Sequence, residues 1–235
     1  MALAIGECIL GDTPRVALAL RDNVARADVD LYIGRGVDMV ELRIDQFEDG
    51  PVEYVQEQLR RFSGIPRIGT VRGRAEGGGW RLDEQQRLAL YRVVIPHVEA
   101  VDIEINADAI HDAVVEAAKT AEVPVIGSFH DFQKTPDENR LNEIIARGIK
   151  SGVDIVKIAC HCADQQDARA LTRVLLDNPE QALIVIGMGA AGAATRLFLP
   201  ALGSLIVYTF LGEPTAPGQL NCDDTIRYLN TFYTQ

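Results

Sequence analysis

The sequence lacks a long apolar segment, a basic start and a dense set of cysteines. No apolar run approaches the roughly 20 residues that a membrane-spanning helix needs. The opening MALAIGECILGDTPR has neither a basic region nor a long apolar region of the signal-peptide type. Cys8, Cys160, Cys162 and Cys222 form no C-x-x-C pair, which favours reduced thiols. We therefore expect a soluble, cytoplasmic protein.

Basic residues are also in short supply. The chain of 235 residues has 23 lysines and arginines against 34 aspartates and glutamates, which gives a net charge of −11. Binding to nucleic acid requires basic patches that neutralise phosphates, and none longer than a couple of residues is present. We expect no nucleic-acid partner. Any anionic ligand has to be bound by a few individually placed cations.

The sequence does contain enough apolar residues, 47% of the chain, to bury a sizeable core. Runs typical of β-strands lie at residues 16–20, 39–43, 67–72, 101–105, 124–129, 154–159, 183–188 and 205–210. Segments with helical spacing lie between them, for example at residues 83–97, 107–121 and 138–150. Because strands and helices alternate, and most strands are nearly continuous in apolar residues, we expect an α/β fold with parallel strands.

The number of strand and helix units indicates one particular α/β architecture. Eight units in this length predict a (β/α)8 TIM barrel that occupies residues 1–235 as a single domain. The segment AIGECILGDT precedes the first unit and contains a Gly-Asp turn. It predicts a short N-terminal β-hairpin that closes the barrel floor.

One stretch argues for a different fold. LIVIGMGAAGAATR, residues 183–196, contains Gly187, Gly189 and Gly192 in the G-x-G-x-x-G spacing that binds a dinucleotide pyrophosphate. A dinucleotide-binding fold places this motif after its first strand, whereas only one predicted strand follows Gly192 here. The acidic residue expected about 20 residues further on would be Glu213, which lies in a Gly-Pro loop. We therefore interpret the glycines as the turn after the seventh barrel strand.

The alternation of side chains along the strands places charged groups inside the barrel. In residues 39–45 the apolar side chains form one face, so Glu41, Arg43 and Asp45 point to the interior. The same alternation in four further strands gives the inward side chains Thr70, Arg72, Asp102, Glu104, Ser128, His130 and Lys157. Catalytic groups of such barrels collect at the C-terminal strand ends. A structural layer of ion pairs is the alternative interpretation.

Lys157, in DIVKIA, is unusual because an apolar strand seldom holds a lysine. Its ammonium loses hydration there, so that burial and nearby cations would favour the neutral amine. A neutral amine attacks a carbonyl carbon and forms a Schiff base. A buried pair of Lys157 with a carboxylate, of structural use only, is the alternative.

No metal site is predicted from the histidines and cysteines. Cys160, His161 and Cys162 are adjacent, and three successive residues of an extended chain alternate faces and cannot all bind one tetrahedral ion. His97 and His111 lie in helix-like segments, and we expect both on the surface.

Six motifs taken together resemble one enzyme family. They are ELR (41–43) with Asp45, TVRGRAEGG (70–78), SFHDF (128–132), VKIA (156–159), MGAAGAATR (188–196) and TAPGQ (215–219). In order and spacing they resemble the type I 3-dehydroquinate dehydratases. The resemblance implies a (β/α)8 barrel, commonly a homodimer, that performs the third step of the shikimate pathway. It implies no metal and no cofactor.

The resemblance also implies catalytic roles. Lys157 would form an iminium with the ketone of 3-dehydroquinate, which acidifies the adjacent C2 proton. His130 would remove that proton, return it to the leaving C1 hydroxyl, and assist formation and hydrolysis of the imine. Glu76 would orient the imidazole of His130.

Further residues would bind the substrate. By the same resemblance, Arg196, Thr215 and Gln219 would hold the carboxylate, for which a guanidinium is geometrically suited. The ring hydroxyls and the carbonyl region would be held by Glu41, Arg43 and Arg72, with Met188 ending its strand beside the site. Residues 212–219, GEPTAPGQ, resemble a lid that excludes water. Position 215 departs from the family, because it is Thr where many members have Ser; the hydroxyl is kept. The roles of Asp102 and Glu104 are left open.

Two other functions would share parts of this pattern. A class I aldolase acting on a sugar phosphate would also use Lys157, but it should present glycine-rich phosphate cradles after strands seven and eight, for which GMGAAG is a candidate. A non-catalytic ligand-binding barrel would not need a nucleophilic lysine.

Overall fold

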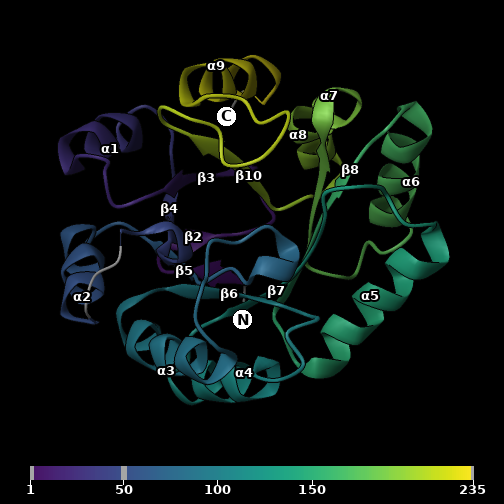
Figure 1. The fold of residues 1–235 in the computed structure, drawn as a ribbon. Helices are drawn as coiled ribbons and strands as arrows, with labels where there is room; N and C mark the ends of the chain where they lie inside the picture. Colours follow the sequence, from purple (N-terminus) through teal and green to yellow (C-terminus); the bar gives the residue numbers. More distant parts are fainter. Residues whose placement is uncertain (1–2, 49–51, 234–235) are drawn as a thin grey trace.

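Parallel strands form the centre of the molecule. In the computed structural model, which describes residues 3–48 and 52–233, they follow the order β10-β3-β4-β5-β6-β7-β8-β9 (Figure 1). Their bounds are β3 (Arg15–Leu20), β4 (Met39–Arg43), β5 (Arg67–Thr70), β6 (Ala100–Glu104), β7 (Val125–Asp131), β8 (Ile155–His161), β9 (Leu183–Met188) and β10 (Ile206–Phe210). The two outer strands approach each other where Leu205 N donates a 3.0 Å hydrogen bond to Leu183 O. The sheet is thus a nearly closed barrel.

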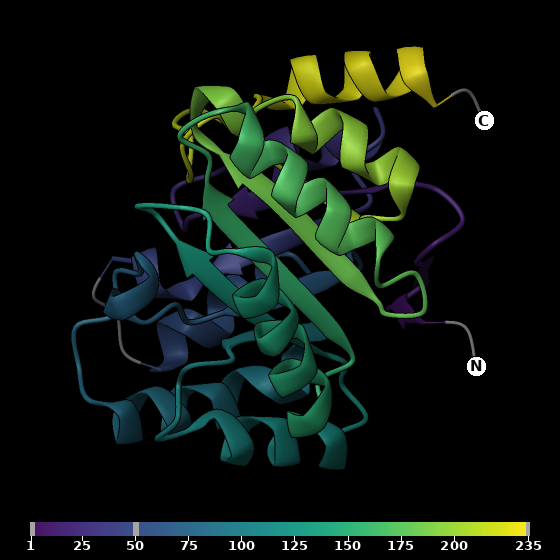
Figure 2. The same ribbon diagram turned by 90° about the vertical axis from the view of Figure 1, so that its right-hand side faces the viewer.

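Helices surround this barrel on all sides, as Figure 1 shows in the view along its axis. The helices are α1 (Arg26–Ile33), α2 (Val52–Arg61), α3 (Glu84–Val94), α4 (His111–Thr120), α5 (Glu138–Ser151), α6 (Gln165–Leu176), α7 (Gly189–Gly192), α8 (Thr195–Phe198) and α9 (Cys222–Phe232). Short 3-10 turns add η1 (Ile44–Gln46), η2 (Arg74–Glu76), η3 (Ile95–His97) and η4 (Leu199–Leu202). In Figure 2, α5 and α6 lie along the outside of β8 and β9. The predicted (β/α)8 TIM barrel is confirmed.

The two expectations for the helix at residues 107–121 need correction. The helix α4 begins only at His111, and no side chain caps its start. His111 is not on the surface but buried, because its ring nitrogens lie 3.0 Å from Glu104 O and 2.9 Å from Ser151 Oγ. The neighbouring α3 agrees with the sequence, since Asp83 accepts a hydrogen bond from Gln86 N in a capping box. None of the helices within the described residues is long and apolar enough to cross a membrane.

The predicted N-terminal hairpin is present and covers one end of the barrel. It consists of β1 (Ala4–Ile5) and β2 (Cys8–Ile9), which pair antiparallel. Ile5 is fully buried in a cluster with inward side chains from the first halves of the strands, among them Met39, Ile68 and Ile126. The hairpin therefore closes the floor, and the opposite end holds the C-terminal ends of the strands.

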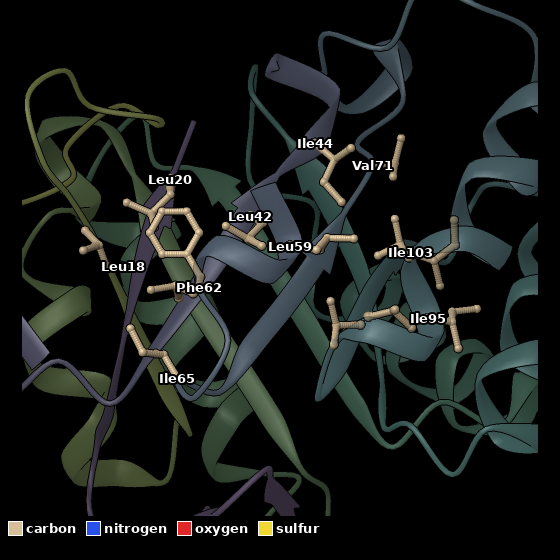
Figure 3. Close-up of a cluster of buried hydrophobic side chains, with 14 of the residues drawn as sticks. Leu18, Leu20, Leu42, Ile44, Leu59, Phe62, Ile65, Val71, Ile95 and Ile103 are labelled. Atoms are coloured by element: carbon tan, nitrogen blue, oxygen red, sulfur yellow. The ribbon is translucent and has the colours of Figure 1, made fainter. Parts of the chain in front are cut away.

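A second apolar layer lies between the strands and the helices. Figure 3 shows Leu18, Leu20 and Leu42, which point outward from their strands toward Leu59 and Phe62 at the end of α2. Burial of one such side chain contributes roughly 1.5–3 kcal/mol. Since the apolar residues of β4 and β6 are used in this layer, the alternate residues face the barrel interior, as predicted.

The glycines after β9 serve close packing of the backbone. Gly189 has a φ of +78°, which favours glycine, and a Cβ on Gly192 would lie 2.5 Å from the carbonyl carbon of Gly187. Gly187 N donates to Thr195 Oγ1 at 2.8 Å, which holds the following turn against the strand. The motif is the turn from β9 into α7, as predicted, in a barrel rather than an open dinucleotide-binding sheet.

We expect Gly192→Ala to lower the free energy of unfolding by about 1–3 kcal/mol, because the methyl group collides with backbone that cannot rotate away. Urea denaturation measures the change. Gly34→Ala is the matched control: Gly34 has an ordinary φ of −64°, and its new Cβ would meet nothing closer than 3.6 Å. If Gly192→Ala were as stable as Gly34→Ala, the close approach of α7 to β9 would be refuted.

Candidate active site

A cavity at the C-terminal ends of the strands brings together every site residue that was predicted from the sequence. They are Glu41, Arg43, Arg72, Glu76, His130, Lys157, Met188, Arg196, Thr215 and Gln219. Five lie on β4, β7, β8 and β9, and the others follow β5, lie on α8 or lie in the loop before α9. These elements meet at one end of the nearly closed barrel, because all of its strands run in the same direction.

Lys157 lies at the bottom of this cavity and is only 4% exposed. Its Nζ is 3.0 Å from Asp102 Oδ2, 3.7 Å from Glu41 Oε1 and 4.0 Å from the centre of the Tyr208 ring. Two carboxylates thus lie within ion-pair distance of Nζ, which is the buried pairing that the sequence offered as the alternative interpretation. The proximity of Lys157 to the cavity leaves its nucleophilic role a prediction.

Asp102 is completely buried and accepts three hydrogen bonds. The donors are Arg72 Nη2 at 2.7 Å, Ser128 Oγ at 2.6 Å and Lys157 Nζ at 3.0 Å. Burial alone would favour the neutral acid, but the charges of Arg72 and Lys157 hold the pKa of Asp102 well below its usual range. The carboxylate is thus permanently charged and links Lys157 to Arg72.

Glu104, whose role the sequence left open, pairs with arginines instead of Lys157. It lies 3.1 Å from Arg72 Nη1, accepts from Gly73 N at 2.7 Å, and bonds the guanidinium of Arg87. Arg87 in turn donates to Val71 O at 2.8 Å. The structure therefore contains the layer of ion pairs that was one interpretation of the inward charges, and this layer fixes the position of Arg72.

The imidazole of His130 is held by Glu76. Glu76 Oε2 lies 3.0 Å from His130 Nδ1 and accepts from His130 N at 2.8 Å. Burial raises the pKa of Glu76 to about 7 although Arg72 opposes this. Burial, together with the charges of Arg72 and Lys157, lowers the pKa of His130 well below its usual value. His130 is therefore neutral near pH 7, and the nitrogen not bound to Glu76, Nε2, is available to take a proton.

Arg196, on α8, is a buried cation that has no carboxylate partner in the described part of the chain. Its Nη2 donates to Pro217 O at 3.2 Å, and its Nε has no hydrogen-bond partner. Burial lowers the pKa of Arg196 to about 10, which still leaves it charged at neutral pH. A buried, incompletely paired guanidinium that lines a cavity is a site for an anion.

The loop of residues 212–219 covers the cavity beside Arg196. Gln219 Oε1 accepts from both Thr215 N and Thr215 Oγ1 at 2.9 Å, so the threonine hydroxyl is used inside the loop and the amide group of Gln219 remains as a donor. The loop rests on the turn after β9, where Gly189 N donates to Pro217 O at 3.1 Å. Because Gly187 N is also occupied, by Thr195, these amides do not form the phosphate cradle of an aldolase.

Sequence reasoning missed several residues of the cavity wall, among them Phe132, Ile186 and Tyr208. Tyr208 follows Ile206 by two positions on β10, so strand alternation alone would have placed it inside. No cluster of three or more metal-ligating side chains occurs within residues 3–48 and 52–233. Cys160 packs outward among apolar side chains, away from the cavity.

Known proteins resemble the chain along nearly its whole length. It is 32% identical over 219 residues to a 3-dehydroquinate dehydratase of Thermodesulfovibrio yellowstonii, covering 93% of this chain and 95% of that protein. A 3-dehydroquinate dehydratase of Methanothrix thermoacetophila is 36% identical over 219 residues, covering 93% and 90%. The crystal structure of the 3-dehydroquinate dehydratase from Aquifex aeolicus superposes with a TM-score of 0.84 at 29% identity, covering 94% of this chain and 100% of that one. Residues 18–235 match the family described as type I 3-dehydroquinase, and the chain belongs to this family.

Proposed function

We propose that this hydro-lyase eliminates water from 3-dehydroquinate to give 3-dehydroshikimate through a Schiff base on Lys157. The observation that carries the proposal is one cavity that contains a buried lysine, a neutral histidine oriented by Glu76, and the incompletely paired Arg196. A ketone, an acidic C–H bond and a carboxylate are the three features of 3-dehydroquinate that these groups suit. The family and its named relatives support the same reaction.

Substrate binding begins with the carboxylate. Within the described residues, Nε of Arg196 has no hydrogen-bond partner, and its Nη2 donates one bond of 3.2 Å to Pro217 O. The side-chain NH2 group of Gln219 is a further donor in the neighbouring loop. Pairing with the carboxylate neutralises a charge whose burial is costly. The ring hydroxyls and the carbonyl region then lie toward Glu41, Arg43 and Arg72, of which Arg43 is fixed by two hydrogen bonds to Asp45 at 3.0 and 2.9 Å.

Imine formation requires Lys157 to give up a proton. The neutral His130 is a base within the same cavity, and it accepts that proton when the amine attacks the ketone carbon. The protonated imidazole gives this proton to the carbonyl oxygen. His130 then takes a second proton from the nitrogen of the carbinolamine and passes it to the hydroxyl group, which leaves as water. The iminium keeps the positive charge where the ammonium was, so Asp102 and Glu41 stabilise it without rearrangement.

Elimination then uses His130 twice. Its Nε2 removes a proton from C2, and the electron pair moves into the iminium to give an enamine. The enamine expels the C1 hydroxyl, which takes the proton back from the imidazolium and leaves as water. A second water hydrolyses the conjugated iminium, releases 3-dehydroshikimate and restores the amine of Lys157. Glu76 stabilises the transient imidazolium through Nδ1 at 3.0 Å.

Four broader expectations from the sequence also stay proposals. We propose that the reaction is the third step of the shikimate pathway, that residues 1–235 form a single domain, and that the active species is a homodimer. The cytoplasmic location likewise remains a prediction.

Sodium borohydride added together with 3-dehydroquinate should reduce the iminium and leave a stable adduct on the peptide that contains Lys157, measured by mass spectrometry. Lys157→Ala should give no adduct and no dehydration while the protein stays folded. The exposed Lys150 on α5 offers a matched control, because Lys150→Ala should react like the unaltered protein. His130→Ala should be slow but still trap some imine. Dehydration without any adduct would contradict the Schiff base.

We expect kcat/KM to rise with pH on the acid side and to level off above about pH 7, because Glu76 has a pKa of about 7. Below this pH, protonated Glu76 no longer accepts the hydrogen bond from His130 Nδ1, and the imidazole loses its orientation. In Glu76→Gln this step should vanish, and kcat should fall roughly 10- to 1,000-fold. A step near pH 7 that persists in Glu76→Gln would show that another group controls the activity.

Arg196→Met should raise the KM for 3-dehydroquinate roughly 10- to 150-fold, as expected for one charged hydrogen-bonded partner. It should not lower the melting temperature, because the guanidinium is buried without a carboxylate. Arg67→Met is the contrasting control: Arg67 bonds Glu99 at 2.9 Å at the other end of the barrel, so its loss should lower the melting temperature and leave KM unchanged. An unchanged KM in Arg196→Met would refute the carboxylate site.

A further inference from the structure

Tyr208 carries a polar group that the proposed mechanism does not use. The side chain points inward from β10, is 5% exposed, and lines the cavity together with Lys157. Its hydroxyl is buried and has no hydrogen-bond partner among residues 3–48 and 52–233. A buried hydroxyl without a partner destabilises the free protein, so such groups are rare unless a ligand satisfies them.

Tyr91, a fully buried tyrosine on α3 in the layer between strands and helices, shows what a structural hydroxyl looks like. Tyr91 donates to Asp102 O at 2.7 Å and is bonded by Val71 N at 3.3 Å. Its hydroxyl therefore completes the hydrogen bonding of the backbone. The hydroxyl of Tyr208, in the middle of β10, makes no such bond within the described residues.

The position of Tyr208 relative to Lys157 and His130 indicates which group of the substrate its hydroxyl contacts. In the barrel order β7-β8-β9, followed by β10, His130 and Tyr208 lie on opposite sides of Lys157. The ketone carbon of 3-dehydroquinate has two ring neighbours, the CH2 at C2 and the hydroxyl-bearing C4. Since C2 must face His130, the C4 hydroxyl lies on the side of Lys157 away from His130. Tyr208 and Glu41, a proposed partner of the ring hydroxyls, both line the cavity there.

We propose, resting on the function proposed above, that the hydroxyl of Tyr208 donates a hydrogen bond to the C4 hydroxyl of the substrate and makes the enzyme selective for it. The donor role agrees with the proton staying on the phenol, because burial and the charges of Glu41 and Asp102 raise the pKa of Tyr208. The aromatic ring lies 4.0 Å from Lys157 Nζ and faces the cation, which is an independent contact that a phenylalanine would keep.

Tyr208→Phe tests the proposal because it removes only the hydroxyl. With 3-dehydroquinate, we expect KM to rise about tenfold and kcat to change less than about threefold, since the bond holds a group that does not react. The melting temperature of the free protein should rise by about 2–4 °C, because the unpaired group is gone. Tyr91→Phe is the matched control, and its melting temperature should fall because two backbone groups lose a partner.

A substrate analogue adds a second, independent readout. Unaltered protein should bind 3-dehydroquinate that lacks the C4 hydroxyl about tenfold more weakly than the parent, whereas Tyr208→Phe should discriminate less than about threefold. Unchanged KM in Tyr208→Phe, or a melting temperature that falls as in Tyr91→Phe, would overturn the proposal. Failure of the proposed function would be seen separately, as absence of dehydration by the unaltered protein.

Discussion

The site depends on the burial of one carboxylate, that of Asp102. A charge with no access to water is tolerated only where several donors surround it, and here Arg72, Ser128 and Lys157 supply them. The donors come from β7, β8 and the end of β5, so the ion pair also fixes the relative position of three strands. If one of the two cations were removed, the other would remain as a charged donor to this carboxylate. The position of Lys157 is thus set by the same ion pairs that order the barrel interior.

The two halves of the cavity also differ in the charges of their side chains. Around Lys157 and Arg72 every cation has a carboxylate nearby, which keeps the floor of the site rigid and charged. Around His130 the groups are close to neutrality, because Glu76 has a pKa of about 7 and His130 a lowered one. A charged floor suits a cationic intermediate, whereas a nearly neutral pair suits repeated proton transfer. Burial produces both effects, and the neighbouring charges decide which group keeps its proton.

Much of the fold could be predicted from the alternation of side chains along the sequence. The predictions were wrong where contacts between distant segments determine the ends of strands or the burial of a side chain. The strands β7 and β8 run on to Asp131 and His161, beyond the predicted ends, because they pair with each other and with β9 there. His111 was expected on the surface because it lies in a helix-like segment, but only the folded chain brings Ser151 to it.

The candidate site divides in a similar way. Alternation alone placed Glu41, Arg43, Arg72, His130 and Lys157 inside the barrel, because they lie on strands or directly after them. Glu76, Arg196 and Gln219 lie in turns, short helices and loops without periodicity, and only the family resemblance pointed to them. The unpaired hydroxyl of Tyr208 is a property of the assembled interior, for which a single sequence has no pattern. The pairing of Lys157 with a carboxylate was among the alternatives that the sequence offered.

The hydrogen bond from Arg196 to Pro217 O connects the loop of residues 212–219 to the proposed carboxylate site. The backbone carbonyl is an uncharged acceptor at the guanidinium that we propose binds the substrate carboxylate. Pro217 O also accepts from Gly189 N, so the same oxygen joins the loop to the turn after β9. In the proposed binding mode, an arriving carboxylate would compete with this oxygen for Arg196 and leave the link to Gly189 intact. The contact between the loop and the turn after β9 would therefore outlast each exchange of ligand at Arg196.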